Sequence, residues 1–135
     1  IPTPAAKVNI VVVGDENCGK STFVTGFLSS MATKTCRAQK IHQTIQIHEQ
    51  DVSVSPGETV QLVLWDFPGH ESFDRLRPLG YTEADVAIIC FDVNDRTSFE
   101  SVIRRWKLEL DIYSPGVPVV LVGLKTDIRG DENRI

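Results

Sequence analysis

A chain of 135 residues with 41% hydrophobic composition is long enough for one domain with an apolar core, and this excludes a disordered or collagen-like chain. A net charge of −4 argues against a nucleic-acid-binding platform. The only basic cluster, Arg104, Arg105 and Lys107, is interpreted as a solvated helix face. The apolar runs are strand-sized, so we expect no membrane contact from this segment. The three cysteines lack metal-ligand spacing and indicate a reducing compartment.

The first residues, 1–6, carry two prolines and are interpreted as a flexible lead-in to a single domain at 7–135. The run Val8–Val13 is rich in β-branched residues and predicts a buried parallel strand. Thr22–Leu28 predicts the opening of a helix. Between them, Gly14–Ser21 fits the pattern G-x-x-x-x-G-K-[ST].

A glycine-bounded loop between a strand and the N-terminus of a helix directs backbone N–H groups and the positive end of the helix dipole toward one point. Such a point is suited to bind a polyphosphate. Lys20 would reach the outer phosphates, and the Ser21 hydroxyl would bind a bridging Mg²⁺. The alternative is a glycine-tolerant turn without a ligand. The strand before the loop and the helix after it favour the phosphate site.

The middle of the chain predicts a hairpin. Residues 29–43 are polar and without periodicity, so we expect a long loop over the phosphate site. Thr44–His48 and Val52–Val54 alternate in opposite phase, which predicts one strand with a bulge near 49–50. Val60–Trp65 is the returning strand of an antiparallel edge hairpin.

Further elements alternate between strands and helices. His70–Tyr81 predicts a short irregular helix, Val86–Phe91 a buried strand, and Val117–Leu124 a last strand. A capping box at Thr97–Glu100 predicts the start of an amphipathic helix. Its expected buried face consists of Phe99, Val102, Ile103, Trp106 and Leu110. The fold class is therefore α/β, a doubly wound, mostly parallel sheet with one antiparallel edge hairpin and the ligand at the carboxyl ends of the strands.

Three motifs, Gly14–Ser21, Asp66–Gly69 and Lys125–Asp127, together resemble the nucleotide-binding motifs of the Ras superfamily of small GTPases. Phe73–Leu79 and the cysteine at position 18 resemble its Rho branch most closely. The resemblance implies a molecular switch that binds GTP or GDP with Mg²⁺ and signals to protein effectors and regulators. It assigns nucleotide contacts to Asp15, Glu16, Asn17, Cys18, Gly19, Lys20, Ser21, Thr22, Gly69, Lys125 and Asp127, metal contacts to Ser21, Thr44 and Asp66, and catalysis to Lys20 and His70.

Several residues depart from the family pattern. Glu16 stands where glycine is common, and a carboxylate near the outer phosphate predicts slow hydrolysis. His70 replaces the water-positioning glutamine; it either takes over that role or is a tolerated surface residue. Leu124 replaces the usual asparagine of the base-recognition motif. Thr44 is assigned as the switch threonine because it precedes Asp66 by 22 residues, the family spacing.

The departures keep two alternatives open: a GTP-locked or nucleotide-indifferent interaction module, and a Roc-type guanine-binding domain of a larger protein. The family continues into a further strand and a last helix, which this chain lacks, so we expect a trimmed chain or a domain fragment. The resemblance implies a cytoplasmic protein, with peripheral membrane attachment only through a lipid anchor in a tail outside this segment.

Overall fold

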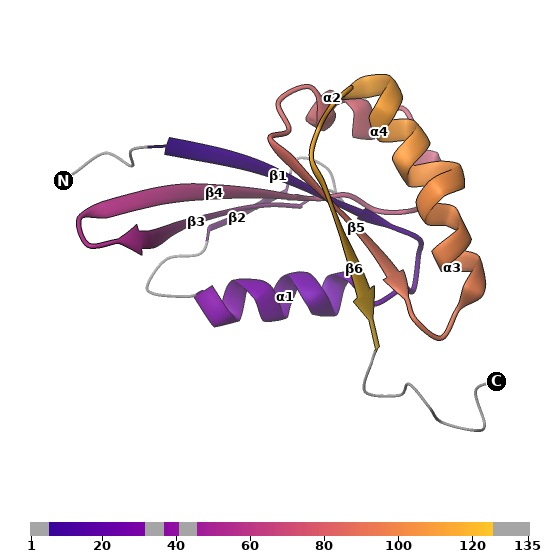
Figure 1. The fold of residues 1–135 in the computed structure, drawn as a ribbon, viewed down its shortest axis with the longest axis horizontal. Helices are drawn as coiled ribbons and strands as arrows, with labels where there is room; N and C mark the ends of the chain where they lie inside the picture. Colours follow the sequence, from indigo (N-terminus) through magenta and orange to yellow (C-terminus); the bar gives the residue numbers. More distant parts are fainter. Residues whose placement is uncertain (1–5, 32–36, 41–45, 126–135) are drawn as a thin grey trace.

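The central strand of the molecule is β1 (Ala6–Gly14), which carries the start of the phosphate-loop motif at its carboxyl end (Figure 1). The structure is a computed structural model, and it describes residues 6–31, 37–40 and 46–125. The sheet of these residues has six strands in the order β2-β3-β4-β1-β5-β6. The other strands are β2 (Arg37–Lys40), β3 (Gln46–Ser55), β4 (Glu58–Asp66), β5 (Val86–Asp92) and β6 (Val119–Leu124).

The second half of strand β1, Ile10–Gly14, is buried because helices cover both faces of the sheet there. Strand β1 pairs in parallel with β4 and β5, and β5 pairs in parallel with β6. Val11 and Val13 point into one core, and Ile10 and Val12 into the other, as alternation along a strand requires. The predicted doubly wound α/β sheet is confirmed.

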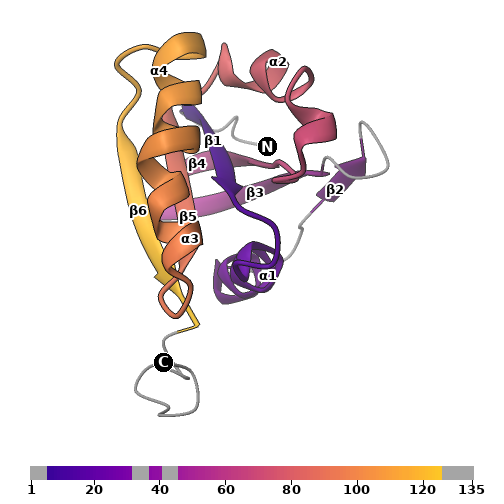
Figure 2. The same ribbon diagram turned by 90° about the vertical axis from the view of Figure 1, so that its right-hand side faces the viewer.

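Helices divide between the two faces of the sheet (Figures 1 and 2). Helix α1 (Lys20–Met31) covers the face that contains Val12, and its own Val24 belongs to the same core cluster. On the other face, Trp106 and Tyr81 pack with Val11. This face is covered by α2 (Arg77–Tyr81), α3 (Arg96–Ser101), the π-helical segment η2 (Val102–Lys107) and α4 (Leu108–Tyr113). None of the helices in the described ranges is both long and apolar enough to cross a bilayer.

The helix that begins at Arg96 differs from its prediction in two ways. Its N-cap is Asp95, whose side chain accepts a hydrogen bond from the Thr97 N–H at 3.0 Å, so the predicted capping box at Thr97 is wrong. The buried positions Ser98, Val102, Trp106 and Leu110 are four residues apart. A π-helical turn is wider than an α-helical one, and this spacing leaves the predicted core residues Phe99 and Ile103 exposed, at 52% and 69%.

The antiparallel edge holds three strands instead of two. Strand β3 pairs antiparallel with β4 as predicted, and Gly57 closes the turn between them with a φ of 81°. The predicted long loop at 29–43 is wrong in part, because α1 continues to Met31 and β2 pairs antiparallel with β3. The register shift lies between Ser53 and Ser55 and not near 49–50.

Candidate functional site

The carboxyl ends of four strands meet around the loop that follows β1. Strand β4 ends at Asp66, β5 at Asp92 and β6 at Leu124, next to Lys125. A cavity of about 570 Å³ opens at this edge of the sheet. Nine of the eleven predicted nucleotide-binding residues line it, together with Pro68: Asp15, Glu16, Asn17, Gly19, Lys20, Ser21, Thr22, Gly69 and Lys125.

The loop from Gly14 to Lys20 has a backbone shaped for an anion. Asn17 and Gly19 have positive φ angles of 64° and 99°, and such turns between helical and left-handed residues direct successive N–H groups into a concavity. The Cys18 N–H donates to the Asp15 carbonyl oxygen at 3.3 Å and closes the loop. The Cys18 side chain is buried in the core below, where burial raises the pKa of its thiol. Its predicted nucleotide contact is therefore restricted to the backbone.

Lys20, the first residue of α1, forms an ion pair with the Asp66 carboxylate. Both side chains are 11% exposed, and both line a neighbouring cavity of about 520 Å³ that also includes Ser21. This pair brings together two residues that the sequence assigned to separate motifs. An incoming phosphate would compete with Asp66 for the ammonium group.

Ser21 and Asp66 offer a hydroxyl and a carboxylate oxygen, the ligand types that Mg²⁺ prefers, on the wall of one cavity. In this structure the Lys20 ammonium neutralises Asp66, so a metal ion could bind the carboxylate only after Lys20 has exchanged it for another partner. The third predicted metal residue, Thr44, and the predicted base reader, Asp127, lie outside the described residues.

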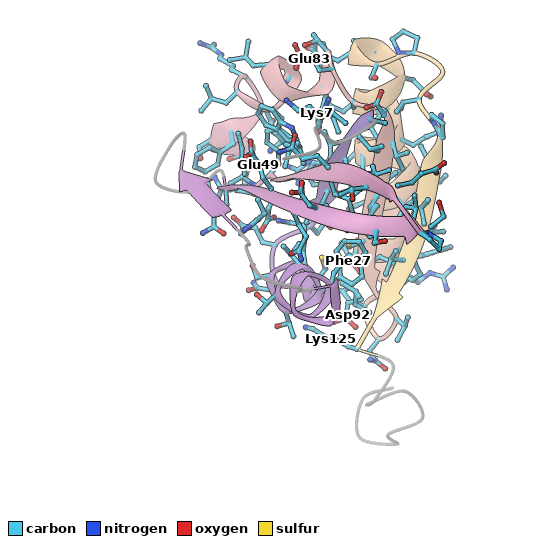
Figure 3. All side chains as sticks on the ribbon, turned by 90° about the vertical axis from the view of Figure 1, so that its left-hand side faces the viewer. Lys7, Phe27, Glu49, Glu83, Asp92 and Lys125 are labelled. Atoms are coloured by element: carbon cyan, nitrogen blue, oxygen red, sulfur yellow. The ribbon has the colours of Figure 1, made fainter. Side chains whose placement is uncertain are left out.

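Lys125 connects the base-recognition motif to the phosphate loop. Its Nζ donates to the Asn17 carbonyl oxygen at 2.7 Å and lies 3.2 Å from Asp92 Oδ2. Figure 3 shows Asp92 and Lys125 side by side at one end of the molecule. Burial opposes ionisation of Asp92, but the Asn94 N–H and Lys125 together lower its pKa. Lys125 is thus held over the loop, on the side where Gly19 approaches Leu124.

The comparisons with known proteins agree with this geometry. Residues 9–134 match the family model described as Ras family. The chain belongs to the Ras family. It is 36% identical over 126 residues to the "GTP-binding RHO-like protein" of Candida albicans, and 38% identical over 130 residues to the "GTP-binding protein rhoC" of Emericella nidulans. The predicted membership of the Ras superfamily and its Rho branch is confirmed.

In both alignments the match covers 93% of this chain but only 35% and 44% of the two relatives. The chain therefore spans less than half the length of the curated Rho-type proteins that it matches. The match to the family model begins in β1 and continues beyond β6, so it includes the loops at the carboxyl edge of the sheet.

In this Ras-family domain, His70 has a structural contact that the sequence did not predict. Its Nδ1 accepts a hydrogen bond from the Ser72 N–H at 3.0 Å, so the exposed ring caps the short helical turn η1 (Glu71–Phe73). Because Nδ1 accepts this bond, the neutral ring carries its proton on Nε2. His70 in this state has a hydrogen-bond donor at Nε2, and the residue lines a neighbouring cavity of about 530 Å³.

Sequence analysis missed the arginines behind the Asp66–Gly69 motif. Arg77 is 1% exposed and its guanidinium lies 4.9 Å from the Trp106 ring centroid. Its donors reach Glu109, Asp74 and the carbonyl oxygens of Pro68 and His70. Arg105, interpreted from sequence as part of a solvated face, is 35% exposed and binds the Gly69 carbonyl oxygen. The only sequence signal was the resemblance of Phe73–Leu79 to Rho proteins, which suggests no partner.

Proposed function

We propose that this Rho-type domain is a guanine-nucleotide-dependent switch that binds GTP and GDP with Mg²⁺ and hydrolyses GTP slowly. The observation that supports it most directly is the 570 Å³ cavity, in which the phosphate loop, Gly69 and Lys125 meet although they lie far apart in the sequence. Three motifs that converge on one cavity have a common ligand as their simplest explanation.

The phosphate groups of the nucleotide would lie on the loop from Gly14 to Lys20. Its left-handed residues and the N-terminus of α1 supply N–H donors, and Lys20 supplies a charge. Binding requires Lys20 to exchange Asp66 for phosphate oxygens. The carboxylate then becomes available to a cation, so a metal ion and a phosphate would bind together at this edge of the sheet.

Ser21 and Asp66 are the described residues that would hold Mg²⁺, and Thr44 completes the proposed set. When bound, Mg²⁺ would neutralise phosphate charge. The base would lie beside Lys125, whose aliphatic stem approaches Gly19, with Cε 3.5 Å from the position of a Cβ there. Asp127 is proposed to accept hydrogen bonds from guanine N1 and N2.

Slow hydrolysis is proposed because of the charges around the Gly69–His70 segment. Glu16 is exposed and lines both the nucleotide cavity and the cavity beside His70. Its carboxylate would oppose the negative charge of the transition state and occupy space that an inserted arginine needs. His70 can orient a water molecule through Nε2–H, but its Nδ1 is already occupied as an acceptor.

The partners of the switch are proposed to be protein effectors and regulators that contact the segment after Gly69 and the region around Thr44. In a switch of this kind the outer phosphate orders these segments, and hydrolysis releases them. The domain is proposed to act in the cytoplasm.

The decisive experiment identifies the nucleotide that the purified protein retains, by denaturing it and separating the released nucleotides by ion-exchange chromatography. We expect guanine nucleotides, with GTP converting to GDP over hours after loading. GTP that persists unchanged for days would favour the interaction module locked with GTP. A protein that retains no guanine nucleotide and gives no heat on titration with GDP and Mg²⁺ would contradict the proposal.

A further inference from the structure

Arg105 lies between the phosphate loop and the segment that follows Asp66, and no motif accounts for it. Its Nη2 donates to the Gly69 carbonyl oxygen at 2.5 Å. Its Nη1 lies 3.6 Å from Asp15 Oδ1, and its Nη2 lies 3.4 Å from Asp74 Oδ1. One guanidinium group therefore joins two segments that are 54 residues apart, Asp15 and Gly69.

Arg105 is held in place by Trp106, the next residue of the same helical segment. The guanidinium carbon lies 4.3 Å from the Trp106 ring centroid, and Trp106 is fully buried. The Trp106 Nε1–H donates to Asp15 Oδ1 at 3.0 Å. Asp15 is thus approached by two donors from one turn of η2, which restricts where Arg105 can lie.

Two arginines hold three successive carbonyl groups. Arg77 binds the carbonyl oxygens of Pro68 and His70 at 2.9 and 3.1 Å, and Arg105 binds the one between them. A trans peptide unit is planar, so a fixed carbonyl also fixes the N–H of the next residue, which points the opposite way. By this relation Arg77 orients the Gly69 N–H through the Pro68 carbonyl, and Arg105 orients the His70 N–H through the Gly69 carbonyl.

Gly69 itself lies in close contact with the phosphate loop. A Cβ at this position would collide with the Gly14 carbonyl oxygen and would lie 3.0 Å from the Glu16 nitrogen. Gly69 lines the nucleotide cavity, while Arg105 lines the adjoining one, which shares Asp15, Glu16, Asn17 and Gly69 with it. Arg105 is therefore placed to keep the Gly69 backbone against the loop without contacting the nucleotide cavity itself.

We propose that Arg105 is a positioning residue that holds the peptide unit between Gly69 and His70 where a terminal phosphate can bind to its N–H, so that the domain selects a nucleoside triphosphate over a diphosphate. The inference rests on the proposed function. A donor fixed before binding costs less entropy to engage than a mobile one. A diphosphate lacks the terminal phosphate and would gain nothing from this arrangement.

The test compares dissociation of fluorescent GDP with dissociation of a fluorescent, non-hydrolysable β,γ-imido analogue of GTP. Arg105→Ala should release the GTP analogue up to about tenfold faster, the cost of ordering one mobile group on binding, and change GDP release less than about twofold. Arg105→Lys keeps the charge but cannot span both segments, so its effect on the analogue should be intermediate. Arg104→Ala is the matched control, because Arg104 is exposed and has no hydrogen bond or ion pair with any residue of 6–31, 37–40 or 46–125.

Equal acceleration of both nucleotides, or no acceleration of the analogue, would overturn the role of Arg105. Tighter binding of the analogue by Arg105→Ala would overturn it as well, because the contact would then oppose triphosphate binding. If Arg105→Ala does not fold, Arg105→Lys decides between the same outcomes. A parent protein that binds neither nucleotide would instead overturn the proposed function, so the two failures are distinguishable.

Discussion

Two cations of this domain, Lys20 and Arg77, differ in burial and in how their charges are neutralised. Lys20 is 11% exposed and has the Asp66 carboxylate as its one partner in the described part of the chain. Arg77 is 1% exposed and has four partners in addition to the Trp106 ring: Glu109, Asp74, and the carbonyl oxygens of Pro68 and His70.

The difference shows which ion pair can change partners. Lys20 adjoins two cavities, so a ligand can reach its ammonium group and replace Asp66. The Arg77 guanidinium is enclosed by these partners, and removing it would leave the Glu109 carboxylate and the Pro68 and His70 carbonyl groups without their donor. We therefore propose that the first pair takes part in ligand binding and that the second maintains the structure of the segment after Gly69.

The largest effect on stability is expected for Arg77→Ala. The variant leaves Glu109 buried beside the Tyr81 hydroxyl, which donates to it at 2.7 Å, and releases the carbonyl groups that Arg77 binds. Breaking a buried pair by removing one partner costs about 3–5 kcal/mol, which urea denaturation of the two proteins would measure. Arg96→Ala is the control, because Arg96 is 91% exposed in its pair with Glu100 and should change the free energy of unfolding little. A loss below about 1 kcal/mol in Arg77→Ala would show that the enclosed pair is dispensable.

Lys20→Ala should affect binding more than folding. Removing the charge that faces the phosphates should weaken GDP binding at least about 100-fold in isothermal titration with Mg²⁺. Because Asp66 opens toward a cavity, water can solvate it, and the unliganded variant should lose less stability than Arg77→Ala.

Lys7→Ala is the matched control for that experiment. Lys7 is an exposed lysine near the start of β1, while Lys20 follows the loop at the strand's other end, and Figure 3 shows Lys7 far from Lys125. GDP affinity that stays the same in Lys20→Ala would contradict the phosphate role of Lys20. A loss of stability as large as that of Arg77→Ala would contradict the distinction between the two pairs.

The same two cations show what the sequence could predict. Lys20 lies in a local motif whose residues are contiguous, so its position and chemistry follow from eight letters and the strand before them. Arg77 meets Glu109 across 32 positions, and Trp106 meets Asp15 across 91. Such pairs depend on how helices pack on the sheet, and no periodicity of a single segment indicates them.

The local errors have local causes. Strand β2 has the sequence Arg37-Ala38-Gln39-Lys40, which lacks the apolar alternation that identifies strands; its pairing with β3 stabilises it instead. The helix at 96 was assigned a Thr97 cap because Glu100 fits a capping box, but Asp95 takes that position. The π-helical segment widens the turn, so a search at 3.6-residue periodicity placed Phe99 and Ile103 on the wrong face.

Glu16→Gly tests whether the Glu16 carboxylate, which lines the proposed nucleotide cavity, slows GTP hydrolysis by repelling the phosphates that Lys20 would attract. Removing the carboxylate should raise the single-turnover rate of GTP hydrolysis about tenfold, because negative charge near the transition state is removed. Adding His70→Ala to Glu16→Gly should lower the rate again if His70 orients water. Glu71→Gly is the matched control, because it is the same substitution at a glutamate that lines the cavity beside His70 but not the nucleotide cavity. A parent protein already as fast as Glu16→Gly would show that Glu16 does not limit the reaction.

The smallest effect is expected for a third ion pair, Asp92 with Lys125, whose side chains are 10% and 37% exposed. Burial alone would raise the pKa of Asp92, but the Asn94 N–H and Lys125 lower it below its ordinary value of 3.8. A lowered pKa in the folded state means that the ionised Asp92 carboxylate stabilises the folded protein above the ordinary pKa. This contribution is lost as the pH falls through the lowered pKa.

Asp92→Asn keeps the shape of the side chain and an oxygen acceptor for the Asn94 N–H. The urea midpoints of parent and variant should therefore differ near neutral pH and converge below about pH 4. Asp111→Asn, in a surface pair with Lys107, is the control and should show no such convergence. A difference that grows on acidification would mean that Asp92 is destabilising when ionised, and that Lys125 is held over the phosphate loop by Asn17 alone.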